Sequence, residues 1–173
     1  MKHAVYCIAR DRTQAETIVD NLRTAGFGSN DISVLFPDKT GTRDFAHEQN
    51  TKAPEGAVTG GVAGMGFGAI LGWLAGIGSL AIPGAGPFIA AGPIMGALGG
   101  AAVGGAAGGI VGALVGMGIP EYEAKLYEGK IRGGNILISV HTDNGDEQSR
   151  VKVIFKNARA EDISSTSEAN VKT

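Results

Sequence analysis

Cysteine is almost absent from the sequence, which has one, Cys7, among 173 residues. A single thiol excludes an internal disulfide framework, and no cysteine–histidine cluster has the spacing of a zinc site. Because Cys7 lies in an apolar run, we expect it to be a small buried side chain. The run is short and is followed by Arg10 and Arg12, so it predicts a first strand rather than a signal peptide.

Charged residues are few and are missing altogether from a long central interval. The formal net charge is −2, which does not favour nucleic acid as a partner. No residue between Glu55 and Glu121 is charged, and this interval contains most of the chain's 29 glycines. The composition divides the chain into an N-terminal segment (1–54), an apolar segment (56–120) and a C-terminal segment (121–173).

Motifs for common catalytic and binding sites are also missing. The sequence has no P-loop, nucleophile elbow or zinc-protease motif, and the glycines at 64–68 lack the strand and the acidic residue of a dinucleotide site. His3 and His141 lie at the ends of two strands that we expect to be neighbours, either as ordinary side chains or as a metal-binding or pH-sensing pair. We predict no catalytic residue, cofactor or metal site, and we expect that the protein is not an enzyme.

The N-terminal segment has the pattern of a strand, a helix and a second strand. Residues 4–9 are continuously apolar, as in a strand buried on both faces. A helix begins at Asp11 or Thr13, with capping-box spacing between Thr13 and Glu16, and ends near Gly26. The second strand and a polar linker follow, at 32–36 and 38–54.

The C-terminal segment repeats this pattern. A helix over 121–130 ends at Gly133 and Gly134 and precedes an apolar strand at 135–140. A turn and cap at 143–146 favour a further helix, whose apolar face contains Val151, Ile154, Phe155 and Ala158, although 151–155 also fits a strand. The last predicted features are an edge strand and a disordered tail, at 161–164 and 165–173.

Together the outer segments predict an α+β fold, a ferredoxin-like α/β sandwich in which 1–54 and 121–164 form one discontinuous lobe. The most apolar strands, 4–9 and 136–140, should be its central pair. The strands at 32–36 and 161–164 should be its edges. The apolar segment is then an insertion whose two ends return to the lobe.

Glycines recur every fourth residue in the apolar segment. We call these the ladder glycines: Gly60, Gly64, Gly68, Gly72, Gly76, Gly92, Gly96, Gly100, Gly104, Gly108, Gly112 and Gly116. On a helix, residues four apart lie on one side, so the ladders predict two smooth grooves that pack closely, with right-handed crossing. Each glycine costs about 1 kcal/mol of helix propensity relative to alanine, so a bilayer or a partner backbone must offset the loss.

The predicted helices span 57–81 and 93–119 and form a glycine-zipper hairpin. Its turn contains Pro83, Gly84, Gly86, Pro87 and Pro93. Each helix would reach roughly 35–40 Å, enough for a hydrocarbon core of about 30 Å. Basic residues on both flanks would place the lobe in the cytoplasm. Tyr122 and Tyr127, after the hairpin, fit either a membrane-interface belt or packing against the lobe.

The strand–helix–strand start, the Ile82–Pro87 turn between glycine ladders and the closing Ala160–Ile163 resemble the bacterial general-stress or heat-induced stress proteins with a central glycine-zipper hairpin. The resemblance covers nearly the whole chain. It implies a small, stress-induced, non-enzymatic bacterial protein associated with a membrane. It supplies no catalytic residue.

Three functional hypotheses follow. In the first, the hairpins insert into the bacterial inner membrane and self-assemble, with the lobes in the cytoplasm. In the second, the protein is a soluble cytoplasmic homo-oligomer, a particle, ring or filament whose hairpins are buried against one another. In the third, the lobe senses a small ligand on a membrane anchor. The partners expected are therefore other copies of the chain and a lipid bilayer.

Overall fold

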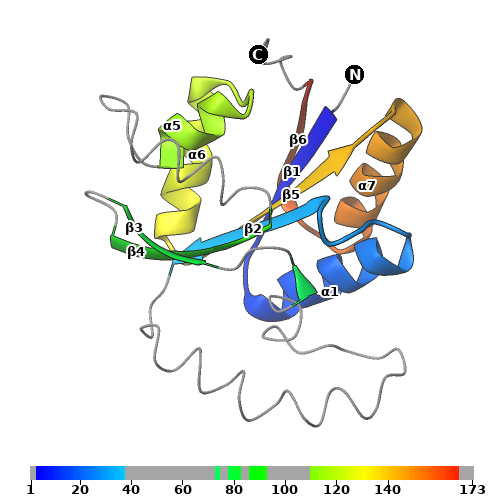
Figure 1. Ribbon diagram of the computed structural model, residues 1–173, viewed down its shortest axis with the longest axis horizontal. Coiled ribbons are helices and arrows are strands. Elements are labelled where there is room, and N and C mark those ends of the chain that lie inside the picture. Colours follow the sequence, from blue (N-terminus) through cyan, green and yellow to red (C-terminus); the bar gives the residue numbers. More distant parts are fainter. Residues whose placement is uncertain (1–2, 38–72, 75–77, 83–85, 93–109, 168–173) are drawn as a thin grey trace, which may run out of the picture.

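Six strands form one antiparallel sheet in the computed structural model, which describes residues 3–37, 73–74, 78–82, 86–92 and 110–167 (Figure 1). The strand order is β3-β4-β2-β5-β1-β6, and every neighbouring pair is antiparallel. The strands are β1 (His3–Ala9), β2 (Ile32–Pro37), β3 (Gly78–Ile82), β4 (Gly86–Ala91), β5 (Ile136–Thr142) and β6 (Glu161–Ser167). The predicted mixed α/β character is confirmed.

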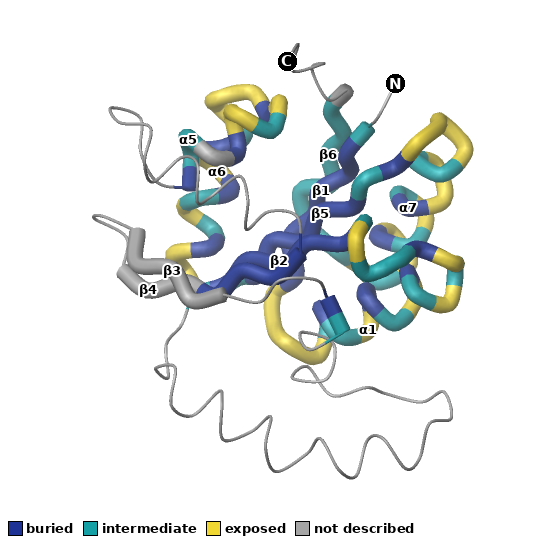
Figure 2. Tube along the Cα trace, viewed as in Figure 1, coloured by how far each residue is buried: buried dark blue, intermediate teal, exposed yellow. Residues whose placement is uncertain are grey.

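Helices cover the sheet on both faces. One layer consists of α1 (Arg12–Thr24) and α7 (Gly145–Asn157), and the other of α5 (Ile110–Gly116) and α6 (Glu121–Arg132) (Figure 1). The strand residues divide between two cores by alternation, so Val5 and Cys7 belong to the first and Ala4 and Tyr6 to the second. The predicted burial of 4–9 on both faces, including that of Cys7, is confirmed (Figure 2).

The expected pairing of 4–9 with 136–140 is confirmed, because β1 and β5 are hydrogen-bonded side by side and neither is an edge, but the two middle strands of the sheet are β2 and β5. The prediction that 32–36 is an edge is wrong. β2 lies between β5 and β4, and its outer side pairs with β4 from Val34–Ala91 to Pro37–Phe88. β6 is an edge strand of the described sheet, as predicted, but it continues to Ser167.

The predicted tail therefore begins too early. Ala4 and His3 at the start of β1 pair with Thr166 and Ser167, so hydrogen bonding to β1 holds residues 165–167 in the sheet. The rest of the predicted tail, 168–173, lies outside the described residues.

The middle of the apolar segment differs from the predicted helical hairpin. The predicted helix over 57–81 is wrong at 78–81, because Gly78–Ile82 is a strand. β3 pairs with β4 from Gly78–Ala90 to Ile82–Gly86. The reversal therefore falls within the predicted turn region, but it joins two strands rather than two helices. Pairing with β2 and β3 satisfies the backbone of β4 without the helix-propensity cost of glycine. Residues 57–72, 75–77 and 93–109 lie outside the described residues.

Side chains cap the N-termini of both helices in the α1–α7 layer. Asp11 Oδ1 accepts from Gln14 N at 2.8 Å, and Gln14 Oε1 accepts from Arg10 N at 2.7 Å. This variant of the capping box, in which Gln14 reaches the residue before the N-cap, replaces the box expected between Thr13 and Glu16. Asn144 and Glu147 make the equivalent box on α7, which confirms a helix over 151–155.

The side chains of Gln14 and Arg150 join α1 and α7 by hydrogen bonds. Gln14 Nε2 donates to Ala158 O at 2.9 Å and Arg159 O at 2.8 Å, at the C-terminal end of α7. In return Arg150 of α7 donates to Ala25 O at 2.6 Å, at the end of α1, and its guanidinium lies 5.7 Å from the centre of the Phe27 ring. Each helix thus satisfies carbonyl groups that the other leaves without a helical partner.

Removing the Gln14 side chain should destabilise the lobe. Gln14→Ala leaves two carbonyl oxygens of α7 and one backbone amide without these hydrogen bonds, so we expect a loss of about 1–3 kcal/mol in the free energy of unfolding. Chemical denaturation measures it. Thr17→Ala, on the exposed side of the same helix, is the control and should change stability by no more than about 0.5 kcal/mol. Equal losses of stability in the two variants would contradict the role of Gln14 in joining α1 to α7.

Candidate functional site

Three ladder glycines lie in the described part of the chain. Gly112 and Gly116 belong to α5, within the range predicted to be helical, whereas Gly92 follows the last residue of β4. The predicted turn residues Gly86 and Pro87 are part of β4. The remaining predicted positions lie outside the described residues: Gly60, Gly64, Gly68, Gly72, Gly76, Gly96, Gly100, Gly104, Gly108, Pro83, Gly84 and Pro93.

Gly92 stands where two backbones approach closely. Its φ of +89° is a left-handed conformation that an α-helix does not contain, so its assignment to a helical ladder is wrong. A Cβ at this position would collide with Ile32 O and lie 2.9 Å from Ser33 Cα. The glycine therefore admits the backbone of β2 rather than that of a second helix.

The end of the apolar segment covers the second face of the sheet. Ile110 and Leu114 of α5, with Ile119 after it, are buried against side chains of α6 and the sheet. The helix predicted to reach 119 ends at Gly116, because Gly118 has a φ of +94° and Ile119 N donates to Leu114 O at 3.0 Å. This part of the apolar segment thus belongs to the core of the lobe.

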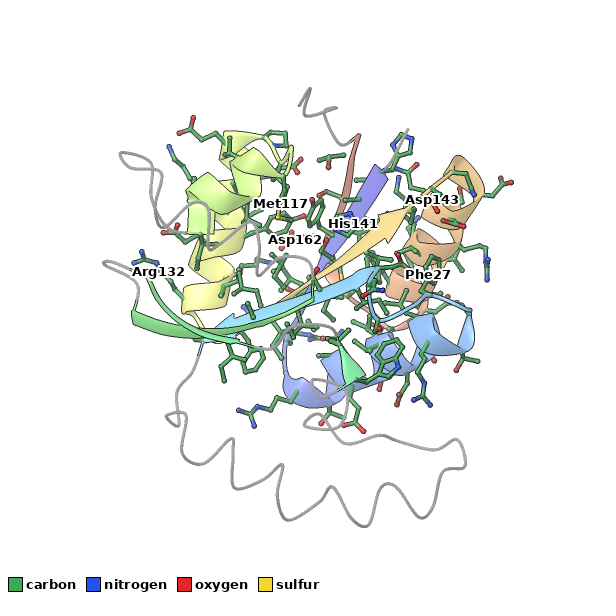
Figure 3. All side chains as sticks on the ribbon, in the orientation of Figure 1. Phe27, Met117, Arg132, His141, Asp143 and Asp162 are labelled. Atoms are coloured by element: carbon green, nitrogen blue, oxygen red, sulfur yellow. The ribbon has the colours of Figure 1, made fainter. Side chains whose placement is uncertain are left out.

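Polar side chains join α6 to the edge strand β6. Tyr127 Oη donates to Asp162 O at 2.7 Å and lies 2.7 Å from Ser164 Oγ. Lys130 Nζ is 3.2 Å from Glu161 Oε2 and forms an ion pair with Asp162. We call these five residues the α6–β6 clasp; Figure 3 labels Asp162 within it.

The electrostatics of the clasp are those of a structural contact. Burial raises the pKa of Tyr127 well above its ordinary value, so its hydroxyl keeps its proton at neutral pH and remains a donor. The hydrogen bond to Asp162 raises the pKa of Lys130 and keeps its ammonium charged. The sequence predicts that Tyr122 and Tyr127 either form a membrane-interface belt or pack against the lobe. Tyr127 packs against the lobe, whereas Tyr122 is 81% exposed.

Two surface hollows lie at the ends of α1 and α7. The larger, about 370 Å³, contains Asp11 and Gln14, whose polar atoms already form the capping box and the α7 contact. The smaller, about 100 Å³, contains Arg150 and Glu147, which bind backbone groups of Ala25 and Asp143. These four side chains end and join helices, while Asp31, His141 and Asp143 also line the smaller hollow.

The histidines do not converge. His3 pairs with Thr142 and His141 with Ala4, so the two occupy adjacent rows of the sheet and project to opposite faces. Within the described ranges, no three His, Cys, Asp or Glu side chains are grouped as metal ligands would be.

None of the described helices combines the length and apolar character needed to cross a bilayer.

The sequence interpretation missed the β3–β4 hairpin, although a signal for it exists. Residues 78–82 and 87–91 are short apolar runs on either side of a Pro-Gly-Ala-Gly turn, which is also a strand-hairpin pattern.

Comparisons with known proteins give no further guide, because no protein-family model, curated protein or solved structure matches the chain.

Two alanine substitutions should separate glycines that the lobe requires from those it does not. Gly92→Ala places a methyl group against the β2 backbone in a left-handed conformation, so we expect a loss of about 2 kcal/mol or more in unfolding free energy. Gly116→Ala meets none of the described atoms within 4 Å and should be neutral or slightly stabilising. Denaturant titration of the two variants measures the difference. Similar losses of stability in both would contradict the distinction between the two glycines.

The pH dependence of stability should reveal Tyr127. Its folded pKa lies above its unfolded value of about 10, so the unfolded chain loses this proton first and stability falls as the pH rises above 10. Tyr127→Phe should reduce stability by about 1–2 kcal/mol at pH 7 and flatten this alkaline decline. Tyr122→Phe, on the exposed side of α6, is the control. An unaltered alkaline slope in Tyr127→Phe would refute the assignment.

Proposed function

We propose that the chain is a non-enzymatic structural protein that assembles with copies of itself through its glycine-rich apolar segment, displaying the lobe on the assembly. The stress association comes from the family that its sequence resembles. The observation that carries the proposal is that the apolar segment is tied to the lobe at several points, while its ladder glycines lie mostly between those points.

We further propose that the lobe is ferredoxin-like. Without the insertion and α6, its elements are β1, α1, β2, β5, α7 and β6, the order β-α-β-β-α-β, and α1 and α7 share one face. Two additions distinguish it. The β3–β4 hairpin extends the sheet beyond β2, and α5 with α6 covers the opposite face.

The attachment points favour assembly over a membrane-spanning hairpin. Leu74 is buried in the core on the α1–α7 face, with Trp73 partly buried beside it, and β4 pairs directly with β2. The described chain is therefore attached to the lobe at residues 73–74, at β4 and again from α5. A segment that crosses a bilayer and returns needs two crossings of about 20 apolar residues each. The uncharged stretches 56–72 and 93–109 are each long enough for one crossing at most, and not for two.

Glycine propensity supports a partner for these stretches. Helices with glycine at every fourth position lose about 1 kcal/mol per glycine, a loss that close backbone contact with another copy offsets. In both hollows, Gln14, Glu147 and Arg150 are already engaged with backbone groups at helix ends. A ligand-sensing lobe has less support for the same reason.

The test is the mass of the purified full-length protein by sedimentation velocity, with and without detergent. Gly68→Leu with Gly104→Leu fills both ladders and should reduce the assembly to a smaller species. Gly66→Leu with Ala106→Leu adds the same side chains two residues away from ladder positions, on the other side of a helix, and should leave the mass unchanged.

An unchanged mass in the ladder variant would overturn self-assembly through the glycines. Recovery of the wild-type protein in a carbonate-washed membrane pellet, released only by detergent, would instead favour the inner-membrane version of the hypothesis. Release by carbonate as a large particle supports the proposal.

A further inference from the structure

The outer face of α6 is apolar and exposed. Tyr122 and Leu126, four residues apart on this face, are 81% and 41% exposed, and Val115 of the adjoining α5 is 43% exposed. Figure 2 shows exposed positions along the side of α6 that faces away from the sheet. Ala124, Tyr127 and Ile131 occupy the buried side of the helix. The exposed apolar side chains therefore do not contribute to the core of the lobe.

Gly129 continues this face, and the lobe gives no steric reason for a glycine at this position. Gly129 lies in the interior of α6 and is exposed, and none of the described atoms lies within 4 Å of where its Cβ would be. Apart from proline, glycine is the poorest helix-forming residue. Tyr122, Leu126, Gly129 and Gly133 follow one another at the spacing of one helical stripe, with two large side chains followed by two glycines.

The first turn of α6 is acidic and its last turn is basic. Glu121 and Glu123 lie in the first turn, and Lys130 and Arg132 in the last. Along one flank of the stripe, Glu121 pairs with Lys125 at 2.8 Å and Glu128 with Arg132 at 3.1 Å. Figure 3 labels Arg132 at the C-terminal end of α6. A helix with acidic and basic ends is complementary to an antiparallel copy of itself.

We propose that α6 is a homodimer interface in which two copies of the helix pack antiparallel about a two-fold axis between Leu126 and Gly129. In this register Leu126 of one copy lies over Gly129 of the other, and Tyr122 over Gly133, so each large side chain fills the space above a glycine. On the flank, Glu121 approaches the other copy's Arg132, and Lys125 approaches its Glu128. The occupant is thus a second copy of this chain.

The interface is independent of the ladder glycines, and it adds a contact between lobes to the proposed assembly. A single helix face, with Val115 at its rim, is at the small end of stable interfaces. We therefore expect a reversible dimer whose population rises with protein concentration, and the measurements need a concentration series.

Charge reversal tests the pairing. One full-length variant carries Glu121→Lys and Glu128→Lys, and the other Lys125→Glu and Arg132→Glu, so that the flank of α6 has charges of one sign in each. Each alone should lose the dimer, because like charges then face each other. An equimolar mixture should restore it as a heterodimer, which shows that neither variant is merely unfolded.

The mixture also provides the decisive outcome. Failure of the mixture to associate, or wild-type association by either variant alone, would overturn the α6 interface. Repeating the series in the Gly68→Leu and Gly104→Leu background separates the two proposals. There the α6 dimer should persist if the ladders alone build the larger assembly, whereas loss of dimerisation in that background would refute the independent interface.

Gly129 supplies a second, opposite-signed test. Gly129→Ala should raise the thermal midpoint of the lobe, because the space is open and alanine favours the helix. Gly129→Leu should weaken dimerisation roughly tenfold or more by separating the helices. A fall in the thermal midpoint with alanine would show that Gly129 serves the lobe itself, and undiminished dimerisation with leucine would contradict the register.

Discussion

The burial of β1 on both faces is the constraint on which the rest of the structure depends. Every residue from Ala4 to Ala9 is fully buried, and the strand lies between β5 and β6. A strand without a solvent face needs an apolar layer on each side of its sheet. α1 and α7 supply one layer, and α5 and α6 supply the other. The C-terminal end of the apolar segment is therefore part of the lobe's core, and the segment cannot be regarded as an appendage.

Helices packed this closely on a sheet bring their polar ends beside one another, and side chains must satisfy them. Gln14 and Arg150 exchange hydrogen bonds between the ends of α1 and α7, while Tyr127 joins α6 to β6. This use of long polar side chains explains the chemistry of the surface as well. At the two hollows, the side chains of Asp11, Gln14, Glu147 and Arg150 direct their hydrogen-bonding groups at backbone atoms.

Local patterns predicted much of the lobe, and long-range pairing was less accessible. The apolar run at 4–9, the helical spacing of Val151 and Phe155 and the glycines after α6 each depend on a few neighbouring residues. The pairing of β2 with β4 depends on residues far apart in sequence. The glycine repeat itself is ambiguous, because four is close to the helical period and is also a multiple of the two-residue period of a strand. Periodicity alone could not distinguish a helical groove from the strand structure found around Gly92.

Steric context resolves that ambiguity one glycine at a time. At Gly92 both the backbone conformation and the neighbouring strand demand glycine, so the residue is explained within the fold. At Gly116 and Gly129 the described surroundings would accept a larger side chain. Glycine lowers helix stability, and the described lobe gives no steric reason for it at these two positions. Close approach of a second backbone is a physical reason for keeping glycine there. Gly92 therefore serves the closing of the sheet, and in the proposed assembly the glycines of exposed helix surfaces leave room for another copy.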